Sequence, residues 1–107
     1  MEAAAGLQPS APIFAALGRI HADLGKLPEA EAFLDRAEQV DPRWEMTYIY
    51  RGLVHQTRHE WTAAAAEFRR ALALNPANST ARELLNGVLT RISFAAESTI
   101  EEDAEHR

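Results

Sequence analysis

A pair of prolines 34 residues apart, Pro42 and Pro76, marks an internal repeat that constrains the fold more than any other feature of the chain. Residues 11–42 placed over residues 45–76 at this offset give seven identical pairs in 32 positions. The pairs are Gly18 with Gly52, His21 with His55, Ala30 with Ala64, Ala32 with Ala66, Arg36 with Arg70, Ala37 with Ala71 and Pro42 with Pro76. Similarity at a fixed period of this length predicts an array of repeated structural units.

Each copy of the repeat is predicted to form two helices joined by a turn. In the first copy Ser10 can cap a helix that has Pro12 in its first turn, and Gly25 provides a left-handed stop. Pro28 lies in the first turn of the second helix, and Pro42 ends it. Apolar residues at helical spacing are expected to face inward: Ile13, Phe14, Leu17, Ile20 and Leu24 in the first helix, and Phe33, Leu34, Ala37 and Val40 in the second.

The second copy predicts helices over about 45–57 and 62–75. Gly52 lies in the middle of a helix, where it costs up to about 1 kcal/mol relative to alanine. Because Gly18 occupies the same register, we expect a neighbouring helix to approach too closely for a side chain at both places. The apolar and small residues that these helices carry at helical spacing are Tyr48, Ile49, Gly52, Leu53, Val54, Ala64, Phe68, Ala71, Leu72 and Leu74.

The remainder of the chain predicts one capping helix followed by an acidic tail. Asn78 or Ser79 can cap this fifth helix, whose apolar face is Leu84, Leu85, Val88, Leu89 and Ile92. The expected organisation is an N-terminal segment 1–10, a helical domain 11–96 and a tail 97–107; the domain comprises repeats 11–44 and 45–78 and the capping helix 79–96. The tail holds five acids and one arginine, and we weigh it either as a solubilising end or as a segment that folds back toward Arg19 and Arg91.

These residues resemble the tetratricopeptide repeat (TPR) family, in which each 34-residue unit is a helical hairpin closed by a proline. The matching positions are Phe14, Leu17, Gly18, Ala30, Leu34, Ala37 and Pro42 in the first copy, and Tyr48, Gly52, Trp61, Ala64, Phe68, Ala71 and Pro76 in the second. The chain departs from the family where His21 and His55 replace tyrosine. Arg51 replaces leucine, so its charge needs a partner or solvent. Asn86 replaces a small residue, which suits a solvated cap.

The resemblance implies an all-α fold, namely a right-handed superhelix of two helix–turn–helix repeats and a C-terminal capping helix. It also implies a concave groove lined by the first helix of each unit, as the site for a partner peptide or helix. The implied partner-binding residues are Ala15, Arg19, Asp23, Met46, Ile49, Leu53, Gln56, Thr80, Glu83, Gly87 and Arg91. The groove lacks the lysines and asparagines with which TPR co-chaperones hold acidic chaperone tails, so such a clamp is not expected.

Two functions follow from this interpretation and both stay open at this point. In the first, Met46, Ile49 and Leu53 form an apolar stripe that binds another protein, so that the chain acts as an adaptor or scaffold. In the alternative, the repeat ends or the same stripe join copies of the chain into a homodimer or larger homo-oligomer, because two and a half repeats leave exposed ends.

Composition and motifs argue against other classes of function. The net charge of −5 and the absence of a basic face disfavour nucleic acid. No segment is apolar enough for a membrane span, and the lack of cysteine suits the cytoplasm. No catalytic motif is found, so we expect no enzyme and no cofactor. His55 and His59 have metal-ligand spacing without a third ligand, so no metal is expected.

Glu29, Glu31, Asp35 and Glu38 are interpreted as a solvated helix face. The excess of arginine over lysine is typical of GC-rich, including bacterial, genomes.

Overall fold

The computed structural model describes the backbone of residues 9–105 and the side chains of residues 9–94. Over this range the chain forms five helices and no strand: α1 Ala11–Asp23, α2 Leu27–Val40, α3 Met46–Thr57, α4 Trp61–Leu74 and α5 Ser79–Glu105. The predicted all-helical fold is confirmed. Residues 1–8 of the predicted N-terminal segment 1–10 and residues 106–107 of the predicted tail 97–107 lie outside the described residues.

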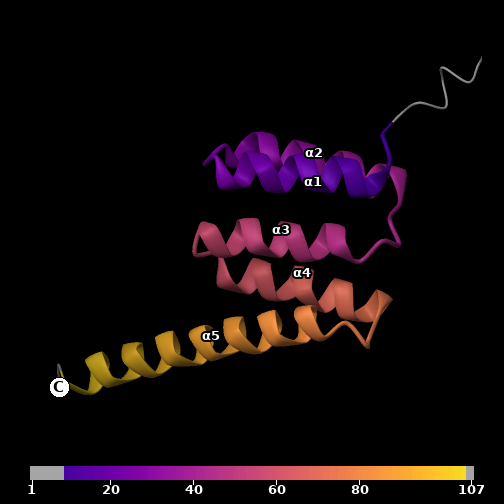
Figure 1. Cartoon of the computed structure of the whole chain (residues 1–107). Coiled ribbons are helices and arrows are strands. Elements are labelled where there is room, and N and C mark those ends of the chain that lie inside the picture. Colours follow the sequence, from indigo (N-terminus) through magenta and orange to yellow (C-terminus); the bar gives the residue numbers. More distant parts are fainter. Residues whose placement is uncertain (1–8, 106–107) are drawn as a thin grey trace, which may run out of the picture.

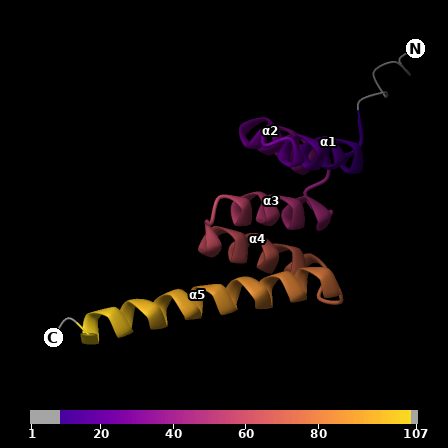
Figure 2. The same cartoon turned by 60° about the vertical axis from the view of Figure 1, so that its left-hand side comes forward.

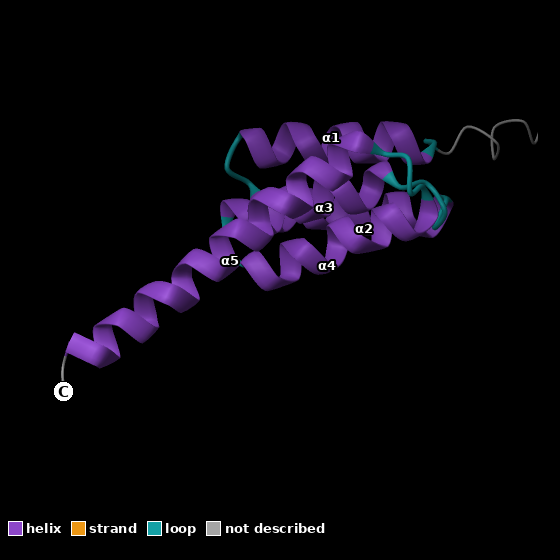
Figure 3. Cartoon of the chain, turned by 90° about the horizontal axis from the view of Figure 1, so that it is seen from below, coloured by secondary structure: helices purple, strands orange, loops and turns teal. Residues whose placement is uncertain are grey.

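The helices are arranged as two hairpins and one long final helix. The α1–α2 hairpin lies next to the α3–α4 hairpin, and α5 packs along α4 (Figure 1). Beyond the second hairpin, α5 continues on its own and projects from the stack (Figures 2 and 3). Helix α5 ends at Glu105, whereas the sequence predicted an end near residue 96. Residues 97–105 contain neither glycine nor proline, so no residue breaks the helix there.

The two hairpins close through turns with the same backbone geometry. Gly25 has a φ of 79°, and His59, which lies 34 residues later, has a φ of 60°. In each turn, the amide of the next residue bonds to the carbonyl of the repeated histidine: Lys26 N to His21 O at 2.8 Å and Glu60 N to His55 O at 2.9 Å. The predicted left-handed stop at Gly25 is confirmed. The second turn has the same shape with a non-glycine residue.

Close approach between helices explains the two mid-helix glycines. A Cβ atom on Gly52 would lie 2.4 Å from Cε1 of Phe68, and a Cβ atom on Gly18 would lie 3.0 Å from Cγ of Leu34. Phe68 and Leu34 are both fully buried. Each glycine therefore makes room for the large side chain of the second helix in its own hairpin.

The core runs through both hairpins and into α5. Its buried side chains gather around Phe14 and Leu34 in the first hairpin, Tyr48 and Ile49 at the middle, and Phe68 and Val88 between α4 and α5. Several residues of the predicted apolar faces are exposed instead: Ile13, Ile20, Leu24, Val40 and Leu74. On α1 the reason is position, because no helix of the described chain covers the outer side of the first hairpin.

Candidate partner-binding pocket between α1 and α3

A pocket of about 450 Å³ opens where α1 faces α3. Helices α1 and α3 contribute most of its lining, with single residues from α2 and the start of α5. The lining residues are Gly18, Arg19, Ala22, Asp23, Leu34, Met46, Ile49, Tyr50, Leu53, Val54, Thr57 and Thr80. The pocket therefore lies across the junction between the two hairpins rather than within either one.

Six of the residues predicted for partner binding line this pocket: Arg19, Asp23, Met46, Ile49, Leu53 and Thr80. Gln56, Glu83, Gly87 and Arg91 do not belong to the lining. Sequence reasoning missed Gly18, Ala22, Leu34, Tyr50, Val54 and Thr57. The signal for Ala22 and Thr57 was present, because Ala22 lies about one turn beyond Arg19 and Thr57 lies one turn beyond Leu53.

The prediction that Ala15 contacts a partner is wrong for a steric reason. Ala15 is fully buried and packs in the core cluster of the first hairpin, which also contains Val54 of α3. Helix α3 thus covers the side of α1 on which Ala15 lies, and a bound partner cannot reach it. Arg91 is exposed, and its guanidinium lies 4.9 Å above the ring of Trp61, at the start of α4.

The pocket combines an apolar floor with a charged rim. Ile49 and Val54 are 1% and 3% exposed, so only a small part of each side chain faces the opening. Leu53 is 36% exposed and forms the accessible apolar surface. Arg19 and Asp23 are exposed on one rim, four residues apart and hence adjacent on the surface of α1.

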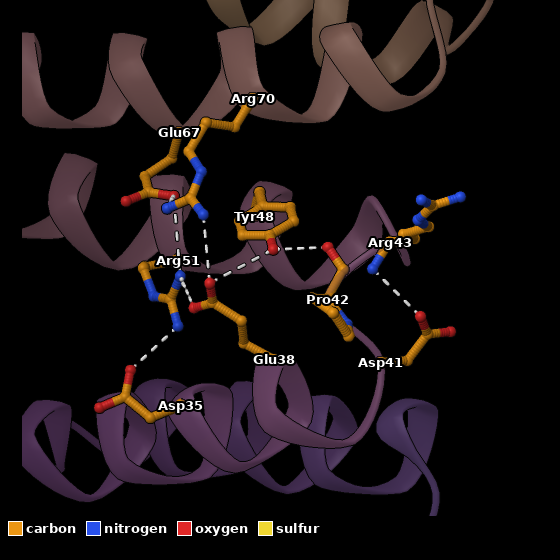
Figure 4. Close-up of polar contacts among 9 residues, drawn as sticks. All are labelled: Asp35, Glu38, Asp41, Pro42, Arg43, Tyr48, Arg51, Glu67 and Arg70. Carbon is orange, nitrogen blue, oxygen red and sulfur yellow. Dashed lines mark hydrogen bonds and ion pairs between the residues drawn. The ribbon is translucent and has the colours of Figure 1, made fainter.

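Next to the pocket, an ion-pair network joins the two hairpins (Figure 4). The Arg51 guanidinium lies 2.9 Å from Asp35 Oδ1 and 2.9 Å from Glu38 Oε1, both on α2, and 3.8 Å from Glu67 Oε1 on α4. Its side chain is only 10% exposed, so these carboxylates supply the partners that a buried charge needs. Asp35 pairs with Arg51 but stays 66% exposed, as a solvated face requires. The interpretation of α2 as a freely solvated acidic face is wrong for Glu38, which is 32% exposed and pairs with Arg51. It is wrong for Glu31 too, which pairs with Arg58.

The network alters two proton affinities. Burial raises the pKa of Glu38, but the charges of Arg51 and Arg70 and their hydrogen bonds outweigh it, so the pKa lies below the usual 4.5. Burial and the nearby Glu38 charge raise the pKa of Tyr48 above 10. The Tyr48 hydroxyl donates to the carbonyl oxygen of Pro42 at 2.7 Å, which ties α3 to the end of the first repeat.

The histidines are engaged in local contacts. His21 Nδ1 lies 2.8 Å from the Leu17 carbonyl oxygen, and His55 Nδ1 lies 2.7 Å from Glu60 Oε1. The exposed ring of His59 stacks on Trp61, with ring centres 5.2 Å apart. Among the described residues, no three histidine, aspartate or glutamate side chains gather as metal ligands.

Two further findings bear on the class of protein. Within the described part of the chain, no helix combines the length and the apolar character needed to cross a membrane. Comparison of the sequence with protein-family models and with curated proteins gives no match.

Proposed function

We propose that this chain is a protein-interaction module that holds a segment of another protein in the pocket between α1 and α3. The observation that carries the proposal is the combination of a buried apolar floor, the accessible Leu53 side chain and the charged pair on α1. An amphipathic helix or extended peptide could place apolar side chains on this floor while its polar groups meet Arg19 and Asp23. Such a chain would serve as an adaptor or scaffold.

We further propose that the two hairpins form a TPR-like right-handed superhelix, in which this pocket is part of the concave groove. The 34-residue offset between equivalent turns and between the equivalent glycines Gly18 and Gly52 supports this arrangement. The proposed binding residues are then those that line the pocket from successive first helices: Arg19 and Asp23 on α1, and Met46, Ile49 and Leu53 on α3.

A peptide-display selection followed by titration tests the proposal. Peptides selected on the wild-type chain are labelled, and their dissociation constants are measured by fluorescence anisotropy for wild type, Leu53→Glu and Leu74→Glu. The two variants carry the same substitution at leucines of similar exposure, 36% and 41%, and Leu74 lies outside the pocket. We expect Leu53→Glu to weaken binding at least about tenfold, because it places a charge against an apolar ligand.

Leu74→Glu should leave the same dissociation constants within about twofold. Arg19→Ala should weaken the selected peptides that carry acidic residues and reduce the salt dependence of their binding. Equal loss of binding in both leucine variants, or no loss in Leu53→Glu, would contradict a site in this pocket.

A further inference from the structure

The outer side of α1 carries a row of four aliphatic side chains that no part of the described chain covers. Ile13 is 53% exposed, Ile20 is 52% exposed and Leu24 is 63% exposed, and Leu17 is partly buried. Their spacing of four, three and four residues places them on one stripe of the helix. We call Ile13, Leu17, Ile20 and Leu24 the α1 row.

The rows at the same repeat positions in α3 and α5 are covered by a helix. The equivalents of the α1 row, 34 and 68 residues later, are Thr47, Arg51, Val54 and Arg58 in α3, and Ala81, Leu85, Val88 and Ile92 in α5. In α3 the row lies against α2, and in α5 it lies against α4. Thr47, Ala81 and Val88 are fully buried, whereas Ile13 and Ile20 at the matching places are half exposed. The α1 row is thus a helix-packing face without its helix.

Each covering helix matches the chemistry of the row that it covers. Two arginines of the α3 row, Arg51 and Arg58, meet the carboxylates of α2. The aliphatic row of α5 instead meets the apolar side chains of α4, with Ala65 and Phe68 in the same buried cluster as Val88. An aliphatic row such as that of α1 therefore requires an apolar cover, because burying unpaired carboxylates against it would be costly.

The α1 row is itself the surface of this chain that best meets the requirement. Among the described side chains, the other large apolar residues with high exposure stand singly on four helices: Val40, Leu53, Leu74 and Phe94. The corresponding row of α2 carries Glu31, Asp35 and Glu38, and that of α4 already packs on α5. Three strongly exposed aliphatic side chains share one stripe on α1.

We propose that two copies of the chain associate through their α1 rows about a twofold axis. The spacing of the row is that of the apolar seam in a two-stranded coiled coil. In an antiparallel pair, Ile13 would lie against the partner's Leu24, and Leu17 against the partner's Ile20. The row runs from Ile13 to Leu24, about 16 Å along the helix, so the interface is smaller than the roughly 800 Å² per partner of a stable complex. The association is therefore weak and depends on concentration.

This surface is separate from the proposed binding pocket. Arg19, Ala22 and Asp23 line the pocket from another side of α1, so pairing through the row leaves the pocket open. The inference does not rest on the proposed function, and either can fail alone. Leu53→Glu should weaken peptide binding without changing the self-association, and a substitution in the α1 row should weaken the self-association without changing peptide binding.

Sedimentation equilibrium of the full chain from about 10 µM to about 1 mM tests the proposal with wild type, Ile20→Glu and Phe94→Glu. Both variants remove an exposed large apolar side chain, and Phe94 lies on α5, away from the row. We expect wild type and Phe94→Glu to show the same monomer–dimer equilibrium. Ile20→Glu should raise the dissociation constant at least about tenfold, because the dimer would bury two unpaired charges.

A mixing experiment separates loss of the interface from loss of folding. Ile20→Lys should be as monomeric as Ile20→Glu. The mixture of the two should associate more strongly than either alone, because the two side chains at position 20 lie in neighbouring layers on either side of the twofold axis and then carry opposite charges. A wild-type chain that stays monomeric over the whole range would overturn the proposal and leave the row to a helix of another protein. Dimerisation that survives Ile20→Glu, that Phe94→Glu removes, or that the mixture does not restore would overturn it as well.

Discussion

The junction between α2 and α3 and the junction between α4 and α5 hold equivalent places in the repeat, yet they are built from opposite chemistry. At the first, Arg51 reaches across to Asp35 and Glu38 on α2 and to Glu67 on α4. At the second, Phe68, Ala64 and Ala65 pack on Val88 with almost no exposed surface. The α2–α3 contact thus combines ion pairs with apolar packing around Val54, whereas the α4–α5 contact is apolar and more extensive.

The difference indicates a division of roles between the two junctions. Apolar burial contributes most to stability, whereas a network of ion pairs fixes relative orientation with little net gain. We call the α2–α3 contact the polar junction and the α4–α5 contact the apolar junction. The polar junction adjoins the α1–α3 pocket, where movement between hairpins would change the width of the pocket. We expect the second hairpin with α5 to form the stable part of the molecule and the first hairpin to be held more weakly.

The largest effect is expected from Phe68→Ala, which empties the apolar junction. Phe68 is fully buried between Gly52 and α5, so its loss should lower the free energy of unfolding by about 3–5 kcal/mol in urea denaturation. Phe94→Ala is the matched control, because Phe94 is 69% exposed. Its effect should stay within about 0.5 kcal/mol. Similar losses in both variants would show that α4 and α5 do not pack as described.

Arg51→Ala should break the polar junction with a smaller effect, about 2–3 kcal/mol, because Glu38 and Glu67 would be left partly buried with only the exposed Arg70 as a shared cation. The exposure of Asp35, at 66%, limits the loss. Arg69→Ala, at an exposed position of α4, is the control and should change stability by less than about 0.5 kcal/mol. A stability equal to wild type after Arg51→Ala would remove the network as a stabilising element.

Alanine substitutions at the two repeat glycines compare how tightly the helices pack within each hairpin. Gly52→Ala forces Phe68 to shift from a 2.4 Å contact and should cost about 1–3 kcal/mol. Gly18→Ala meets Leu34 at 3.0 Å, a milder clash that the better helix propensity of alanine partly offsets. Thermal unfolding should therefore rank wild type above Gly18→Ala and Gly18→Ala above Gly52→Ala. The reverse order of the two variants would contradict the packing of Phe68 over Gly52.

The smallest expected effect is the loss at low pH of the stability that Glu38 contributes at the polar junction. The pKa of Glu38 in the folded chain lies below the usual 4.5, so its contribution to stability is full above that pH and is lost as the pH falls through the folded value. Glu38→Gln should therefore flatten the acid side of a stability-against-pH profile measured by urea denaturation. Glu29→Gln, on the exposed side of α2, is the control. An identical profile for wild type and Glu38→Gln would contradict the assigned shift.

Much of the fold could be predicted from the sequence because it depends on local signals. Helix spacing, the prolines and Gly25 define the elements, and the identity of Gly18 with Gly52 indicates close helix packing. The pocket was predicted in part, since Arg19, Asp23 and Leu53 lie on the expected faces. The predictions that failed concern residues whose surroundings come from another helix. Only the position of α3 shows that Ala15 is covered. Only the packing of α3 on α2 and α4 brings Arg51 to carboxylates that lie 13 to 16 residues away in the chain.

The comparison of the junctions is tested most directly by native-state hydrogen exchange, measured amide by amide. We predict that amides in the middle of α1 and α2 exchange through openings of lower free energy than those in α4 and the first half of α5, because the first hairpin separates at the polar junction before the apolar core opens. Equal opening free energies in both regions, or greater protection in α1 and α2, would contradict it.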